Sequence, residues 1–353
     1  MSSTTKVEIR SGPHIKGTRT VEQIMANVVW SLMPVCGFFA YQYGLSAIAS
    51  ILTITVACLL TERFFVRLGG QAGDLSDWSA TITGLLLALT LPPGFPLWMG
   101  VVAGFTAIAL GKAIFGGIGH NIFNPALVGR AFVQAAFPTA IATYTPSFLP
   151  DRFAEFIPST LALPLMTPAS AIQWLHDKNL DALTGATPLA RWKFEGVVAS
   201  SWDLATSLSG HMAVGPSPLL ILLCGAYLAA RRFMDWRIPL AVIGSAAISA
   251  ILLYTFRGNA HYPEPSFMLF SGGLILGAIY MATDMVTSPI TPRGMWIYGA
   301  LIGLLTVMIR YYGGLPEGIM YAILIGNACT PLIERISQPE AFGTAVTRKE
   351  KKK

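Results

Sequence analysis

Charged residues are scarce in this sequence. Asp, Glu, Lys and Arg make up only 12% of its 353 residues, whereas hydrophobic residues make up 53%. An ordinary soluble domain carries about twice that charged fraction. So few charges cannot solvate a protein of this size, and most of its surface must therefore face lipid. The same composition excludes a disordered chain, a collagen-like fibre and a disulfide scaffold.

Cysteine and histidine are also few, and their spacing excludes the common metal sites. The four cysteines lie singly inside apolar segments, with no CxxC pair, as expected of small thiols packed between helices. The five histidines show no HxxxH or HExxH spacing, and no Walker-type phosphate loop is present. We therefore expect this chain to bind no metal ion and to hydrolyse no nucleotide.

Ten apolar runs follow one another along the chain, at 24–43, 45–62, 78–91, 97–115, 122–138, 216–230, 238–256, 266–282, 294–310 and 317–334. A helix of about 20 apolar residues crosses a bilayer core. The pattern therefore predicts an all-α polytopic membrane protein with about ten transmembrane helices. The third run and the fifth to eighth are short or interrupted, which favours irregular backbone that lines a protein interior.

The basic residues predict how the chain is oriented. With the N-terminus placed in the cytoplasm, 17 of the 24 Lys and Arg residues fall in cytoplasmic segments, including a tail with lysines at 349 and 351–353. Segments of membrane proteins that stay in the cytoplasm carry such an excess. We therefore expect both termini to be cytoplasmic. The net charge of +6 has the same origin, so it does not indicate nucleic-acid binding.

These patterns divide the chain into five parts. They are a cytoplasmic N-terminal segment (1–23), a first set of five helices (24–138), an extracytoplasmic loop (139–215), a second set of five helices (216–334) and a basic cytoplasmic tail (335–353). The loop is relatively polar and rich in Pro, Ser and Thr, with short helices expected at 168–178 and 188–196. A loop of this length is usually functional or disordered. We expect it to form a small extracytoplasmic subdomain.

The two sets of helices share short sequence similarities. Gly84-Leu85-Leu86-Leu87 resembles Gly273-Leu274-Ile275-Leu276, Leu97-Trp98-Met99 resembles Met295-Trp296-Ile297, Gly116-Gly117 resembles Gly313-Gly314, and 124–130 resembles 327–335. Helices three to five thus correspond to helices eight to ten. Because this offset of five crossings is odd, the two sets must run in opposite directions. We therefore expect an inverted five-plus-five repeat, an architecture that places binding sites between its halves.

The long loop contains a motif with chemical meaning, Asp181-Ala182-Leu183-Thr184-Gly185-Ala186-Thr187. Asp, two variable residues, Ser/Thr, Gly, Ala and Ser/Thr form the acceptor pattern of proteins that a dedicated flavin transferase modifies. The last hydroxyl attacks the pyrophosphate of FAD and retains FMN as a phosphoester, which leaves the isoalloxazine ring unmodified. The motif predicts covalent FMN on Thr187, on a flexible and exposed strand, with Asp181, Thr184, Gly185 and Ala186 as the rest of the acceptor motif.

Thr187 also has a purely structural interpretation. Threonine followed by Pro188 is a favourable helix start, with threonine as the N-cap and proline at the first helical position. The two interpretations are compatible, because the N-terminus of a helix favours a phosphate.

Motifs along almost the whole chain resemble one protein family. They are the segments 11–14 (Ser-Gly-Pro-His), 116–126 (Gly-Gly-Ile-Gly-His-Asn-Ile-Phe-Asn-Pro-Ala), 184–190 (Thr-Gly-Ala-Thr-Pro-Leu-Ala) and 281–289 (Met-Ala-Thr-Asp-Met-Val-Thr-Ser-Pro). With these motifs the chain resembles the D subunits (RnfD) of the Rnf ion-translocating ferredoxin:NAD oxidoreductases. That family is related to the B subunits of the sodium-pumping NADH:quinone reductases.

This resemblance implies a function in electron transport. It implies a membrane flavoprotein that passes electrons through covalent FMN on Thr187 and couples transfer between NADH and ferredoxin to ion movement. It also implies a flavin transferase for maturation, a second, non-covalent flavin (riboflavin), and a place beside the A, B, C, E and G subunits in a six-subunit complex of the bacterial inner membrane. The sequence leaves open which ion moves, Na⁺ or H⁺, and which way electrons flow.

Three charged residues within or next to the apolar runs are further candidates. Asp284 follows the eighth run, where a carboxylate is a candidate for ion coupling, although it can also cap a turn or face solvent. Lys112 and Arg130 can pair with anionic groups or snorkel toward the membrane surface, and we expect snorkelling for Lys112.

Two other functions fit the architecture. A small-solute channel or transporter is the first, because urea transporters also use an inverted five-plus-five bundle and a fold does not fix a function. A structural anchor for partner subunits is the second. Neither function needs a flavin acceptor on an outer loop, so the motif that ends at Thr187 favours the flavoprotein.

Overall fold

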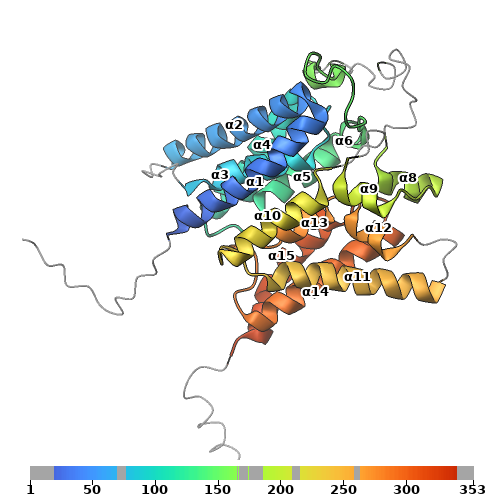
Figure 1. Ribbon diagram of the computed structural model, residues 1–353. Helices are drawn as coiled ribbons and strands as arrows, with labels where there is room; N and C mark the ends of the chain where they lie inside the picture. Colours follow the sequence, from blue (N-terminus) through green and yellow to red (C-terminus); the bar gives the residue numbers. More distant parts are fainter. Residues whose placement is uncertain are drawn as a thin grey trace, which may run out of the picture.

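The computed structural model describes residues 20–69, 77–164, 166, 174, 186–208, 215–257 and 263–339, and within these ranges all regular structure is helical (Figure 1). The first group of helices, coloured blue to green, lies beside the second group, coloured yellow to red. The prediction of an all-α polytopic membrane protein is therefore confirmed.

Within the described ranges, six helices are long and apolar enough to cross a membrane. They are α1 (Val21–Tyr43), α2 (Leu45–Leu68), α4 (Leu97–Gly111) extended by the 3₁₀ turn η2 (Ala113–Phe115), α11 (Arg237–Arg257), α14 (Pro292–Tyr312) and α15 (Ile319–Ser337). Helix α11 corrects the expectation that the seventh apolar run is short or interrupted, because it is continuous over 21 residues. Its Pro239 lies in the first turn, where proline removes no hydrogen bond.

The other four predicted runs form shorter segments, as expected. Three of them are α3 (Ser79–Thr90), α5 (Pro125–Ala136) and α10 (Pro218–Ala230). The fourth breaks into α12 (Pro265–Phe270), α13 (Leu274–Leu276) and a π-helical turn, η5 (Gly277–Met281). The break lies at Gly272, whose φ of +63° suits glycine and few other residues.

The long loop also contains short helices. They are α6 (Pro138–Ala142), the 3₁₀ helix η3 (Pro158–Leu161), α8 (Pro188–Glu195) and α9 (Ser201–Thr206). Helix α8 confirms the helix expected at 188–196, whereas the one expected at 168–178 lies almost entirely outside the described residues. The loop is held to the bundle by Arg152. Its Nε donates to the carbonyl of Tyr41 at 2.8 Å, and its own carbonyl accepts from Leu45 N at 2.9 Å.

The two halves pack their long helices in the same way. Gly100 and Gly104 of α4 face α2, and a Cβ on Gly104 would lie 3.1 Å from the Cβ of Ala57. Gly299 and Gly303 of α14 face α11 in the same manner, and a Cβ on Gly299 would lie 2.5 Å from the Cβ of Ala241. Small residues four apart let membrane helices approach closely. This shared packing supports the internal repeat.

Corresponding helices of the two halves run in opposite directions. Helix α10 packs along α1, and Tyr227 in its last turn donates to Asn27 near the start of α1 at 3.3 Å. Helix α5 is likewise antiparallel to α15. The side-chain amide of Asn327, in the middle of α15, lies 3.1 Å from the backbone nitrogen of Asn124 at the start of α5, whereas Arg130 further along α5 pairs with Glu317 just before α15. These contacts support an inverted arrangement.

The start of the first membrane helix, α1, and the end of the last one, α15, lie on the same side of the bundle. The start of α11 contacts the start of α14 through Trp236 and Trp296, whose ring centroids lie 6.2 Å apart. The start of α14 in turn contacts the end of α15 through the hydroxyls of Thr291 and Ser337, 2.5 Å apart. Since α10 leads into α11 from beside the start of α1, residues 20 and 339 lie at one end and α8 at the other (Figure 1).

Candidate functional site

Thr187 begins a helix, and its side chain is not exposed. It is the N-cap of α8, and its Oγ1 accepts a hydrogen bond from the backbone nitrogen of Ala190 at 3.3 Å. Only 9% of the residue is exposed. The sequence interpretation as an N-cap is therefore confirmed, whereas the expectation of an exposed strand at this residue is wrong. The reason is that Pro188 and Leu189, which follow it, are both buried.

The rest of the acceptor motif is only partly described. Ala186 is half-buried and lies in a bend just before the helix. Asp181, Thr184 and Gly185 lie outside the described residues.

Helix α8 is docked firmly on the bundle. The side chain of Leu189 is fully buried, and Trp192 packs edge-on against Tyr311 with ring centroids 5.4 Å apart. Lys193 Nζ donates to three carbonyls at the end of α14, namely those of Arg310 at 2.9 Å, Leu315 at 3.0 Å and Gly313. A cation at the C-terminus of a helix is favoured by the helix dipole. Partial burial lowers the pKa of the Lys193 ammonium.

Thr187 borders a cavity between the two halves, here called the Thr187 cavity. Its walls come from the C-terminal ends of α1 and α3, from α5, from the start of α10 and from the break between α12 and α13. Its polar wall residues include Arg130, Tyr144 and Glu317. A group attached to the Thr187 hydroxyl would therefore meet residues from both halves of the bundle.

Two buried guanidinium groups lie at this cavity, that of Arg130 in its lining and that of Arg310 next to Gly272 in its wall. Arg130, 7% exposed, pairs with Glu317 and donates to the carbonyl of Thr90. Arg310, fully buried, donates to the carbonyls of Met268 and Ser271 on either side of the helix break. Within the described part of the chain, the Nε atoms of both arginines have no hydrogen-bond partner.

A second cavity lies at the other end of the same helices, here called the Asp284 cavity. It is lined by the first turns of α1 and α3, the start of α5, the end of α10 and the residues from Ile279 to Val286. Helix α3 thus contributes Ser79, Ile82, Thr83 and Leu86 to this cavity, and Leu89 and Thr90 to the Thr187 cavity. The two cavities therefore lie at opposite ends of one interface between the halves.

Asp284 is half-buried and caps its own turn. Its carboxylate accepts from the backbone nitrogen of Val286 at 3.2 Å and from the hydroxyl of Thr287 at 3.3 Å. It also lines the second cavity. The structure thus confirms the capping interpretation, and a role in ion coupling stays a prediction.

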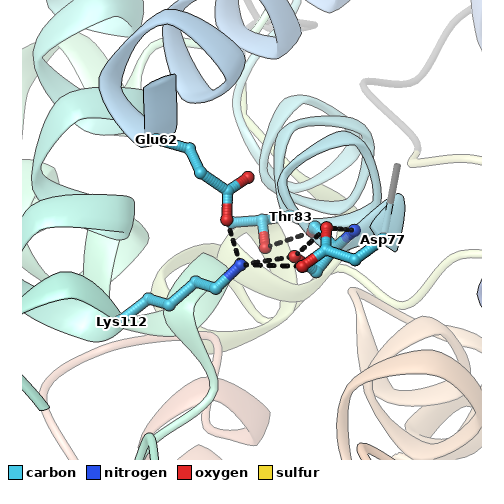
Figure 2. A network of polar contacts seen from close by, with 5 residues as sticks. Glu62, Asp77, Thr83 and Lys112 are labelled. Carbon is cyan, nitrogen blue, oxygen red and sulfur yellow. Dashed lines mark hydrogen bonds and ion pairs between the residues drawn. The ribbon is translucent and has the colours of Figure 1, made fainter. Parts of the chain in front are cut away.

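Lys112 also lines the Asp284 cavity, and it does not snorkel. It is 6% exposed, and Figure 2 shows its ammonium group pointing between Glu62 and Asp77. It pairs with Glu62, lies 3.7 Å from Asp77 Oδ2 and contacts the hydroxyl of Ser79 at the start of α3. The expected snorkelling is wrong because Glu62 on α2 supplies a buried counter-charge. Arg130, for which pairing was the other option, is paired.

Sequence patterns missed three of these charged residues. Glu62, Arg310 and Glu317 each lie within or next to an apolar run, where a charge is costly unless it is paired or functional. That position was the available signal. What the sequence hides is the pairing, because Glu62 lies 50 residues from Lys112 and Glu317 lies 187 residues from Arg130.

Comparison with known proteins assigns almost the whole chain to one family. The sequence model of the NQR2, RnfD, RnfE family matches residues 8–343. The D subunit of the proton-translocating ferredoxin:NAD(+) oxidoreductase complex of Clostridium ljungdahlii is 35% identical, over 95% of this chain and 96% of that protein. The D subunit of the Na(+)-translocating ferredoxin:NAD(+) oxidoreductase complex of Acetobacterium woodii is 37% identical, over 98% of each chain. The D subunit of the ion-translocating oxidoreductase complex of Sodalis glossinidius is 36% identical, over 95% and 98%.

Proposed function

Because the chain belongs to the NQR2, RnfD, RnfE family, we propose that it is the D subunit of an ion-translocating ferredoxin:NAD oxidoreductase complex and carries FMN on Thr187. One observation carries this proposal. Thr187, the last residue of the acceptor motif, is the N-cap of α8 and lines a cavity between the two halves of the bundle. Relatives of similar identity are named for H⁺ and for Na⁺. Family membership therefore leaves the ion open.

Attachment joins the threonine hydroxyl of this chain to FAD in a step catalysed by the flavin transferase. The Thr187 oxygen bonds to the phosphorus next to the riboflavin, the pyrophosphate bond breaks, AMP leaves, and the hydroxyl proton passes to a base of the transferase. Because the hydroxyl is buried once α8 has docked, attachment precedes docking in this proposal. The result is a phosphodiester, which carries one negative charge.

The residues around Thr187 fit such a group. Thr187 and Arg130 line the cavity between the halves, and Arg310 lies next to Gly272 in its wall. Among the described residues, the Nε atoms of both arginines have no hydrogen-bond partner. Tethered there, FMN supplies transfer of one or two electrons. The chain itself binds and orients the group, and the packed apolar walls around Ile275 and Leu276 exclude water.

The Asp284 cavity is our proposed place for the second, non-covalent flavin. Asn124, Thr83 and Tyr280 offer polar groups within a wall that is otherwise largely apolar, which is the usual composition of a cofactor site. Among the described residues at this end, the buried cation Lys112 faces two carboxylates, the buried Glu62 and the half-buried Asp77, and Asp284 lies in the cavity wall. This excess of negative charge disfavours a phosphate, so it favours riboflavin over FMN.

The proposal places this chain among partners in the bacterial inner membrane. Those partners are the A, B, C, E and G subunits of the Rnf complex, with a flavin transferase for maturation. Long helices expose large apolar side chains to lipid or neighbouring subunits, for example Trp30, Leu52 and Phe64. The channel and anchor alternatives account for the bundle but not for the acceptor motif, and the relatives named above are oxidoreductase subunits.

Orientation is tested by labelling single cysteines in the long loop and in the C-terminal tail. We expect the loop to react with a membrane-impermeant reagent from outside and the tail only from the cytoplasm. The structure supports opposite ends for α8 and the last described residues. Labelling of both positions from the same side would contradict the proposed topology.

The function is tested by Thr187→Ala in the assembled complex. We expect the complex to form but to lose electron transfer between NADH and ferredoxin, and ion movement with it. Thr187→Ser keeps a hydroxyl and should keep both activities. Pumping at the wild-type rate by the alanine variant would show that the flavin is not needed, and would favour the transporter or the anchor.

A further inference from the structure

The charges around the Thr187 cavity do not balance among the described residues. Arg130 and Arg310 are both buried, and Glu317 is the one described carboxylate that lines the cavity. Glu317 pairs with Arg130. In the described part of the chain no carboxylate lies within ion-pair distance of Arg310, whose partners are the carbonyls of Met268 and Ser271. The net charge of these three side chains is therefore +1.

A buried charge without a counter-ion is costly. The cost of removing a guanidinium from water is offset by a close ion pair with good hydrogen bonds. Carbonyl groups satisfy hydrogen bonds of Arg310 but do not neutralise it. One further negative charge in this cavity would complete the balance.

The polar atoms that remain unsatisfied point to the same place. Arg130 lines the cavity, and only 7% of it is exposed. Its Nε has no hydrogen-bond partner among the described residues. Thr187 lines the same cavity at the N-terminus of the eight-residue α8, where backbone N–H groups favour an anion. A guanidinium and a helix N-terminus therefore border one cavity.

We propose that Arg130 and the N-terminus of α8, with the charge of Arg310 behind the wall, form a binding site for one phosphate group of the flavin, and that Arg130 positions this group. This inference rests on the proposed attachment of FMN to Thr187. A phosphodiester on Thr187 carries the single negative charge that brings the three side chains to neutrality. Arg130, from the first half of the bundle, thus contacts both Glu317, from the second half, and the phosphate on Thr187, from the loop.

The test uses the full-length chain produced without the flavin transferase, so that Thr187 keeps a free hydroxyl. FMN and riboflavin differ only by the phosphate, and each is titrated against the purified chain. Binding at the Asp284 cavity is measured alone in a chain already flavinylated on Thr187 and is subtracted, so that the remaining affinity belongs to the Thr187 cavity. The variant is Arg130→Gln with Glu317→Gln, because removing Arg130 alone would leave Glu317 buried without its partner. Arg191→Gln, on an exposed face of α8 where it pairs with Glu195, is the matched control.

We expect the double variant to bind FMN about tenfold more weakly, since a charged hydrogen bond to phosphate is worth roughly one decade of affinity. Its affinity for riboflavin should stay the same, which also shows that the chain is folded. The control should change neither affinity. Equal weakening of both flavins, or unchanged FMN affinity, would overturn the inference.

Attachment is scored separately, by flavin fluorescence of the denatured wild-type chain after production with the transferase. A chain without covalent flavin that still prefers FMN through Arg130 refutes the attachment and leaves the phosphate site standing. A fluorescent chain whose FMN affinity ignores Arg130 refutes the site alone.

Discussion

The two cavities lie at opposite ends of one helix interface and carry opposite buried charge. At the Asp284 cavity, Lys112 faces the carboxylates of Glu62 and Asp77 (Figure 2). At the Thr187 cavity, Glu317 is the one lining carboxylate among the described residues, and it pairs with Arg130, whereas Arg310 donates to carbonyl groups. The halves are related in packing but not in charge. This difference in charge supports our proposal that each end binds a different ligand, a neutral flavin at the Asp284 cavity and a phosphate-bearing flavin at the Thr187 cavity.

The largest effect is expected from breaking the balance at the Asp284 cavity. Lys112→Met leaves Glu62 and Asp77 without their cation, and breaking one side of a buried pair costs about 3–5 kcal/mol. The thermal unfolding temperature of the purified chain should fall steeply. Lys112→Met combined with Glu62→Gln should recover part of the loss. If the single variant is as stable as the wild type, the network does not hold α2, α3 and α4 together.

A smaller effect is expected from loosening α8 at the Thr187 end. Lys193→Met removes the donor to three carbonyls at the end of α14, worth about 1.5 kcal/mol for a half-exposed group. The undocked state in which Thr187 is accessible would then be populated about tenfold more. The rate at which the transferase modifies the already folded, unmodified chain should rise accordingly. Arg191→Gln is the control, and equal rates in all three chains would show that docking does not limit attachment.

The smallest effect concerns flavin choice at the Asp284 cavity. In a chain already flavinylated on Thr187, only the second site is titrated. We expect riboflavin to bind more tightly than FMN, and Asp284→Asn to narrow the difference about fivefold, because one repelling charge at the wall is gone. Competition between the two flavins measures it. An unchanged or wider preference would contradict the role of charge at this end.

The sequence predicted the positions of the helices better than their lengths. Apolar runs located the helices, because burial in lipid requires apolar side chains along the whole span. It misjudged α11, because Pro239 and Gly244 look like interruptions, although proline in a first turn breaks nothing and one glycine is tolerated. The antiparallel relation of α1 and α10 followed from the odd number of crossings, and Asn27 and Tyr227 support it.

The site was predictable where chemistry is local and not where it is long-range. The helix cap at Thr187 was predictable because a threonine before a proline is a local signal in consecutive residues, and its role as flavin acceptor stays a proposal. The burial of Thr187 was not predictable from the sequence. It depends on the packing of Leu189 against residues far away in the sequence, such as Phe267 and Met268. Lys112 was misread for the same reason, since its partner Glu62 is on another helix. A single charged residue in an apolar run indicates a partner but does not name it.

Peptide mass mapping of the chain produced with its flavin transferase tests the central claim most directly. The peptide that contains Thr187 should carry the mass of FMN joined through phosphate with loss of one water. Fragmentation should place this mass on Thr187 and not on Thr184, and Thr187→Ala should abolish it. An FMN adduct on Thr184, or one retained in the Thr187→Ala chain, would contradict the assignment.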